Sequence, residues 1–290
     1  MSGPTAMLID GGRLHLQHGP IDLIIGVDGG DRRAVFAAAT ARFGTVLEEL
    51  VAELPLLKAD FRGCLEGPGG SIAQRMAKAV RPHARGFVTM MAAVAGAVAD
   101  AVLAAMMRAG PFTRAYVNNG GDIALFLGDG QIYRSAIATL DGRDIGRIVI
   151  SAQDDMRGIA TSGQGGRSLS FGIAESVTVA ARDAAAADVA ATLIANAVDL
   201  GDHPAIDRCA ANALQPDSDL GMRKVVRRVG ALTAAEIAQA LSAGAIVAHD
   251  MMNRNLIAGA VLVLRGEQRI IGASRMMTNL FPQQKKVIHA

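Results

Sequence analysis

An almost uncharged segment, Gly86 to Met107, lies between Arg85 and Arg108 and reads GFVTMMAAVAGAVADAVLAAMM. It is long enough to cross a bilayer as a helix. Most of its apolar residues are alanine, which contributes little to insertion, and Asp100 would lie past the middle at a cost of about 2.5 to 3.5 kcal/mol. The segment therefore predicts a buried helix, roughly residues 91–107, in a soluble protein. Asp100 would then be a buried carboxylate that needs polar partners.

The composition indicates a globular protein with a small-molecule ligand. The chain has 290 residues, of which 51% are hydrophobic and 19% charged, and this excludes a disordered chain. Its formal charge is +2 and only 3% of residues are aromatic, so a nucleic-acid partner is not expected. Cys64 and Cys209 lie far apart and predict two buried, reduced thiols. Residues 1–10 lack the features of a signal peptide, so we expect a cytoplasmic protein without a membrane partner.

Period-two and helical patterns predict an α+β fold with a mainly antiparallel sheet packed against long Ala-rich helices, as a single domain over residues 1–290. The expected strands are 13–18, 21–27, 113–117, 122–127, 131–137, 145–151, 176–180, 257–264 and 268–271. The expected helices are 31–50, 72–80, 91–107, 181–198 and 233–242, the last with a capping box and an end at Gly244. Region 199–219 reads equally well as a linker or a surface loop.

Two glycine-rich motifs are candidates for ligand contact. In the first, a strand runs into two glycines, whose backbone allows close approach of a ligand, while asparagine side chains add donors. In the second, two hydroxyl groups lie in a loop whose N–H groups suit phosphate oxygens. An ordinary turn and a flexible loop explain these motifs about as well. The motif residues are Asn119, Gly120, Gly121 and Asp122, then Thr161, Ser162 and Gly163.

A third motif combines a carboxylate and a hydroxyl in the second Ala-rich helix. Asp188 and Thr192 are four residues apart, so they share one face of the helix and are able to bind the same cation. Mg²⁺ prefers such hard oxygen ligands and often takes only one or two from protein. The alternative is that Asp188 is an ordinary satisfied charge, since polar pairs at this spacing are common. The histidines form no metal-binding motif, and residues 67–71 are explained by an N-cap as well as by an anion site.

In their order along the chain, these segments resemble the ApbE superfamily. The resemblance covers roughly residues 85–198 and depends on the ordered set rather than on one motif. It implies an ApbE-like fold, FAD or FMN as a ligand, and Mg²⁺ as a cofactor. In that family the enzyme transfers the FMN half of FAD to a protein Ser or Thr. The implied metal ligands are Asp188 and Thr192. The implied cofactor-binding residues are Asp100, Asn119, Gly120, Gly121, Asp122, Thr161, Ser162 and Gly163.

Two family motifs of the transferases are missing. Ala95-Gly96 stands where they have Lys-Gly, and residues 167–176 lack the His and the Asp-Pro turn that follow their TSG loop. The chain is therefore most similar to an uncharacterised, signal-free sister branch. We expect a Mg²⁺-dependent enzyme, of an FMN-transferring or FAD-hydrolysing type, that binds a flavin nucleotide or a similar phosphate-containing ligand. A non-catalytic binding module and an enzyme of an unrelated polar metabolite are the alternatives.

Overall fold

The computed structural model describes residues 3–64, 67–138, 144–166, 168–272 and 277–278. Its centre is a nine-stranded sheet in which every strand runs antiparallel to its neighbours, in the order β1-β2-β3-β4-β5-β8-β9-β12-β13. The strands are β1 (Thr5–Ile9), β2 (Arg13–His18), β3 (Ile21–Asp28), β4 (Arg114–Asn119), β5 (Asp122–Leu127), β8 (Gly158–Ser162), β9 (Ser176–Ala181), β12 (Gly259–Leu264) and β13 (Glu267–Gly272). This confirms the predicted α+β fold with an antiparallel sheet.

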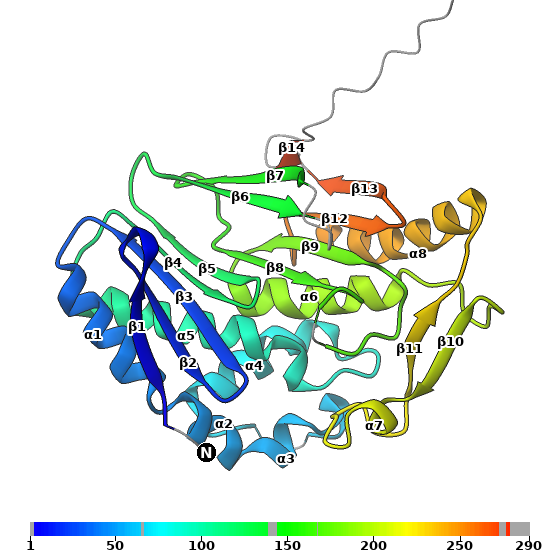
Figure 1. The fold of residues 1–290 in the computed structure, drawn as a ribbon, viewed down its shortest axis with the longest axis horizontal. Coiled ribbons are helices and arrows are strands. Elements are labelled where there is room, and N and C mark those ends of the chain that lie inside the picture. Colours follow the sequence, from blue (N-terminus) through cyan, green and yellow to red (C-terminus); the bar gives the residue numbers. More distant parts are fainter. Residues whose placement is uncertain (1–2, 65–66, 139–143, 167, 273–276, 279–290) are drawn as a thin grey trace, which may run out of the picture.

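Helices cover one face of this sheet (Figure 1). They are α1 (Arg32–Phe43), α2 (Val46–Ala52), α3 (Leu54–Leu57), α4 (Ser71–Val80), α5 (Val94–Ala109), α6 (Ala184–Ala197) and α8 (Ala234–Asn253). Helix α5 packs on β4 and β5, α6 packs on β8 and β9, and the two helices contact each other. Alanine and glycine allow this close approach, because their small size leaves room for the helix backbones to lie near the sheet and near one another.

Two smaller sheets complete the structure. Strands β6 (Ile132–Ala138), β7 (Asp144–Ser151) and β14 (Met277–Thr278) form a sheet on the face opposite the helices (Figure 1). Isoleucines of β6 and β7 bury a cluster of apolar side chains against β5, β8 and β12. Strands β10 (Ile206–Ala210) and β11 (Lys224–Val229) pair with each other, and the short helix α7 (Ala211–Leu214) lies between them in the chain.

The Ala-rich segment forms the buried helix that the sequence predicts. Among the described residues, one helix, Met90–Ala109, is long and apolar enough to cross a membrane, and 61% of its apolar window is buried inside the protein. Asp100 finds the polar partners that its burial requires. Its two carboxylate oxygens accept hydrogen bonds from the amides of Ala184 and Ala185, at 3.1 and 3.0 Å. It therefore holds the start of α6 against α5.

Some sequence predictions are wrong at the level of elements. Gly244 does not end α8, which continues to Asn253. A Cβ atom at Gly244 would lie 2.3 Å from Cγ2 of Val198 and 2.9 Å from Cδ2 of Leu262, so this glycine lets the helix pack closely. The predicted helix 31–50 is interrupted around Gly44, between α1 and α2.

Strands β1, β8, β10 and β11 are not among the predicted elements, and the thiols are more accessible than expected. Thr161 and Ser162, predicted to lie in a glycine-rich loop, are the last two residues of β8, and the chain leaves the strand at Gly163. Strand β1 is mostly exposed, and β10 falls in the region 199–219 that was interpreted as a linker or loop. Cys64 and Cys209 form no disulfide, as predicted, but both are partly exposed rather than buried.

Candidate functional site

A cavity of about 310 Å³ opens between the helix-covered face of the sheet and the segments that flank α5 and α6. This volume lies at the lower end of the range for small-molecule sites. Five chain segments that are far apart in the sequence contribute to its lining. Eight of the residues predicted from the sequence are among them, namely Asn119, Gly120, Asp122, Thr161, Ser162, Gly163, Asp188 and Thr192.

The turn between β4 and β5 places two polar side chains at the cavity. Gly120 and Gly121 have φ angles of 64° and 112°, so the chain reverses in two residues and Asn119 pairs directly with Asp122. Both side chains point toward the helices and are 6% and 8% exposed. Asn119 Nδ2 donates to the carbonyl of Ala95 at 3.1 Å, which ties the turn to the start of α5. The motif is thus both a tight turn and a wall of the cavity.

Helix α6 presents the predicted carboxylate and hydroxyl pair to the same cavity. Asp188 Oδ2 accepts a hydrogen bond from the amide of Gly96 at 3.0 Å, and Asp188 keeps some exposure toward the cavity. Thr192, one turn further along, donates from Oγ1 to Oγ of Ser162 at 3.5 Å. The approach of α5 depends on Gly96, because a Cβ atom there would lie 2.2 Å from the carbonyl oxygen of Ala184.

The carboxylates of Asp122 and Asp188 are both buried and repel each other when both are charged. Burial raises the pKa of Asp188 well above its ordinary value, and the nearby charge of Asp122 adds to this. Burial also raises the pKa of Asp122, while a hydrogen bond from the amide of Thr161, at 3.3 Å, acts in the opposite direction. Each of these carboxylates therefore favours a proton or a cation close by.

Two of the residues predicted to bind the cofactor are not among those lining the cavity. The carboxylate of Asp100 is engaged by the start of α6, as described above. Gly121 donates its amide to Oδ1 of Asn118 at 2.8 Å, within the turn. The structure thus gives both residues a supporting position behind the site.

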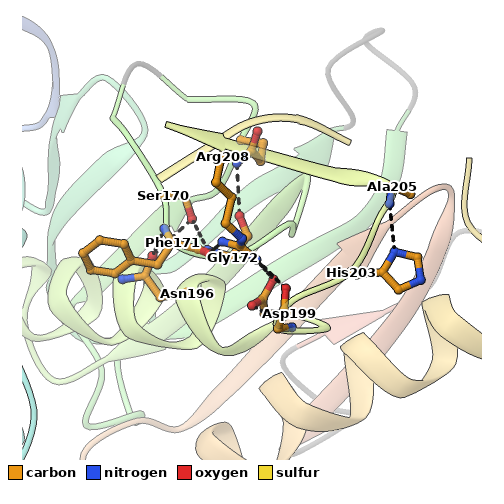
Figure 2. A network of polar contacts seen from close by, with 10 residues as sticks. Ser170, Phe171, Gly172, Asn196, Asp199, His203, Ala205 and Arg208 are labelled. Carbon is orange, nitrogen blue, oxygen red and sulfur yellow. Dashed lines mark hydrogen bonds and ion pairs between the residues drawn. The ribbon is translucent and has the colours of Figure 1, made fainter. Parts of the chain in front are cut away.

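Sequence reasoning missed Asn196, which is also in the lining. Its Oδ1 accepts hydrogen bonds from Ser170 Oγ at 3.1 Å and from the amide of Phe171 at 2.9 Å, and Figure 2 shows these contacts. Arg208 donates to the carbonyl of Phe171 from the other side and pairs with Asp199. The network holds the segment 168–172 against the cavity. The repeat of polar residues at 188, 192 and 196, each four apart on one helix, is a signal that would have found Asn196.

The segment Gln215–Leu220 covers part of the cavity and had no local signal in the sequence. Asp219 accepts a hydrogen bond from Thr89 Oγ1 at 2.5 Å, which attaches this segment to the chain before α5. Arg223 lies over the ring of Phe87, 3.5 Å from its centroid, and forms a second attachment. The cover is therefore held to one wall at two points.

The donor set fits a hard divalent cation. Three carboxylates line the cavity, from Asp122, Asp188 and Asp219, while the described lining contains no lysine, arginine or histidine. The described residues include no cluster of three His, Cys, Asp or Glu side chains that would hold a metal on its own. Mg²⁺ commonly uses one or two carboxylates and completes its shell with water and substrate phosphates. Asp188, Asp122 and the hydroxyl of Thr192 would supply the protein part of such a shell.

Comparisons with known proteins agree with the family expected from the sequence. A family model described as "AbpE bacteria" matches residues 5–270. The UPF0280 protein of Methanosphaerula palustris is 36% identical over 171 residues, which cover 58% of this chain and 70% of that protein. The UPF0280 protein of Methanospirillum hungatei is 34% identical over 173 residues, with coverage of 58% and 67%.

Solved structures with a similar arrangement include flavin transferases. The ApbE protein of Thermotoga maritima is 13% identical, covers 91% of this chain and 97% of its own, and has a TM-score of 0.47. The apo form of the flavinyl transferase ApbE of Pseudomonas stutzeri is 14% identical, with coverage of 95% and 93% and a TM-score of 0.41.

Proposed function

This chain belongs to the AbpE bacteria family, and on that premise we propose that it is a Mg²⁺-dependent enzyme acting on the diphosphate of a flavin nucleotide or a similar ligand. The observation that carries the proposal is the cavity in which Asp122 and Asp188 lie near the hydroxyls of Ser162 and Thr192. The ordered motifs that resemble the ApbE superfamily, together with the family model over residues 5–270, support the ligand class.

The charge of the cavity explains why a cation is needed. A diphosphate is an anion, and carboxylates repel it unless a cation lies between them. The described lining offers no cationic side chain for this purpose. A divalent cation on Asp188 and Thr192 would neutralise both the carboxylates and the phosphate oxygens, and it would stabilise charge that develops on the phosphate during cleavage.

The remaining lining residues suit the other parts of such a ligand. The amide of Gly163, just after β8, is able to donate to a phosphate oxygen, whereas the amide of Thr161 already donates to Asp122. Apolar side chains of Phe87, Phe171 and Leu193 provide a wall for a ring system. The rings of Phe87 and Phe171 meet edge to face, with centroids 6.1 Å apart, so this wall is packed before a ligand enters.

The test is to incubate the purified protein with FAD, with and without Mg²⁺, and to measure AMP and FMN by chromatography. We expect AMP release that depends on Mg²⁺ and is reduced at least about a hundredfold in Asp188→Asn, the loss typical of removing one preorganised electrostatic contact. Asp129→Asn is the matched control, since this exposed aspartate lies in the turn after β5 and does not line the cavity.

The other outcomes separate the alternatives. Mg²⁺-dependent binding of FMN or FAD without AMP release would contradict the enzymatic part and leave a ligand-binding module. Absence of both turnover and flavin binding would contradict the ligand class, and an unrelated polar metabolite would then be the better hypothesis. AMP release that Asp188→Asn leaves unchanged would contradict the metal site.

A further inference from the structure

A second cavity, of about 360 Å³, lies where the first residues of β2 and α1 meet β3, β4 and β6. Side chains alternate along β4, so Val117 and Asn119 point toward the helices while Tyr116 points to the opposite face. The two cavities therefore use opposite faces of the same strand.

The charge of this basic cavity is opposite to that of the candidate functional site. Four arginines and one aspartate are in its lining, namely Arg13, Arg32, Arg114, Arg134 and Asp28. The aspartate is already neutralised, because its carboxylate pairs with Arg114 at 2.5 Å. Three positive charges therefore remain around a space large enough for a small ligand.

Backbone carbonyls rather than carboxylates hold two of these arginines. Arg32 Nη2 donates to the carbonyl of Val27 at 3.0 Å, and Arg13 Nε donates to the carbonyl of Asp10 at 2.9 Å. A guanidinium group has five N–H donors, so each of these groups is oriented while most of its donors stay free. Arg134 is exposed and has no ion-pair partner among the described residues. Guanidinium groups without an ion-pair partner, two of them oriented by backbone carbonyls, suit bidentate binding of a phosphate.

Two tyrosine rings form an aromatic wall beside the arginines. The rings of Tyr116 and Tyr133 pack against each other with centroids 5.8 Å apart. Gly26 makes this possible, because a Cβ atom there would lie 2.3 Å from Cε1 of Tyr116. The Tyr116 ring thus lies across the backbone of β3, and it offers an apolar surface next to the positive charge.

We propose that this basic cavity is a second ligand site, which binds a small phosphorylated metabolite without a divalent cation. The guanidinium groups of Arg13, Arg32 and Arg134 hold the phosphate, and the organic part lies against the Tyr116 and Tyr133 rings. The proposal does not depend on the function proposed for the first cavity, since the two sites share no lining residue.

The chain contains two tyrosines and no tryptophan, so all of its tyrosine fluorescence comes from residues that line the basic cavity. The probe is phenyl phosphate, titrated in EDTA, with fluorescence as the signal and equilibrium dialysis as a direct measure of binding. We expect saturable binding, and we expect phenol, which lacks the phosphate, not to bind. The double variant Arg32→Gln/Arg134→Gln should bind about a hundredfold more weakly, since each of the two lost charge-assisted bonds contributes about tenfold.

Two further variants make the test specific. Arg33→Gln removes the same charge one residue away on the same helix, outside the cavity, and should bind normally. Asp188→Asn should also bind normally, which separates this site from the first cavity. No binding by dialysis at millimolar phenyl phosphate would overturn the proposal. Equal affinity of the double variant and the wild type, or a requirement for Mg²⁺, would overturn it as well. Circular dichroism confirms that each variant is folded.

Discussion

Single buried polar side chains join the helices of this core, and Asp100 is the main example. It lies on an Ala-rich helix and accepts two backbone hydrogen bonds from the first turn of another helix. Without such partners a buried carboxylate would cost several kcal/mol. Asp188 makes the reverse contact: it lies on α6, and its carboxylate accepts a hydrogen bond from the amide of Gly96 on α5. The two carboxylates thus connect the same two helices.

We predict that the contribution of Asp100 to stability depends on pH. Burial raises the pKa of its carboxyl group to about 7, against an ordinary value near 4. A raised pKa in the folded state gives stability that is complete below about pH 4 and is lost as the pH rises through about 7. In metal-free buffer, the free energy of unfolding of the wild type minus that of Asp100→Asn should therefore fall by about 1 kcal/mol or more between pH 5 and pH 8.

Urea unfolding at several pH values measures this difference. His83, whose pKa burial lowers to about 4, acts in the opposite sense below pH 6.5. Its effect is present in both proteins and cancels in the difference. A difference between wild type and variant that does not change with pH would show that Asp100 is ionised throughout.

We also predict that Asn196→Ala weakens both ligand binding and the fold. The variant removes the acceptor for Ser170 and for the amide of Phe171, and so it frees the segment that forms one wall of the candidate site. Loss of two such hydrogen bonds should lower the free energy of unfolding by about 1 to 3 kcal/mol. Flavin affinity, measured by fluorescence of FMN in the presence of Mg²⁺, should fall at least several-fold. Unchanged affinity in a destabilised variant would contradict a role of this wall in binding.

At the scale of elements, the contact between α5 and α6 is set by small residues. We predict that Gly96→Ala lowers the free energy of unfolding by about 1 to 3 kcal/mol, because its Cβ atom would meet the backbone of Ala184 and Ala185 at 2.2 to 2.7 Å. Thermal or urea unfolding measures the effect. Gly86→Ala is the control, since a Cβ atom there meets nothing within 4 Å. Similar stability of the two variants would contradict the close approach of the helices.

The elements could be predicted from the sequence where one local pattern decides them. The capping box at Thr233 and Glu236 forms as predicted, with hydrogen bonds in both directions. Gly244 shows the limit of such prediction. A glycine that ends a helix and a glycine that leaves room for a neighbouring strand look the same in the sequence. Strand β10 shows another limit: it begins after a polar loop and has its single partner, β11, in a later segment. Pairing of that kind is decided by tertiary contacts.

At the scale of the whole molecule, the candidate site is assembled from segments that only the fold brings together. The order of the motifs was enough to predict that Asp122, Ser162 and Asp188 belong to one site, and they line one cavity. The cover from residues 215–220 could not be predicted, because its contact with Thr89, and that of the following Arg223 with Phe87, join positions more than a hundred residues apart. The basic cavity was missed for the same reason, since its arginines come from four separate elements.

We predict that FMN bound in the first cavity stabilises the folded chain, and that this stabilisation requires Mg²⁺. A ligand that binds only the folded state stabilises it by about 2.7 kcal/mol at a hundred times its dissociation constant. FMN and Mg²⁺ together should therefore raise the melting temperature by several degrees, while FMN alone should not, because the carboxylates then repel its phosphate. Differential scanning fluorimetry in the two buffers measures this, with a dye whose emission is separate from that of the flavin.

The same measurement on Asp188→Asn tests whether the cation acts through the Asp188 carboxylate. In metal-free buffer near neutral pH this variant should be at least as stable as the wild type, because it removes a buried charge that Asp122 opposes. With FMN and Mg²⁺ it should lose most of the stabilisation, since the cation has lost its main carboxylate. A variant that is less stable without metal and equally stabilised by FMN and Mg²⁺ would mean that Asp188 serves only the contact between the two helices and does not bind the cation.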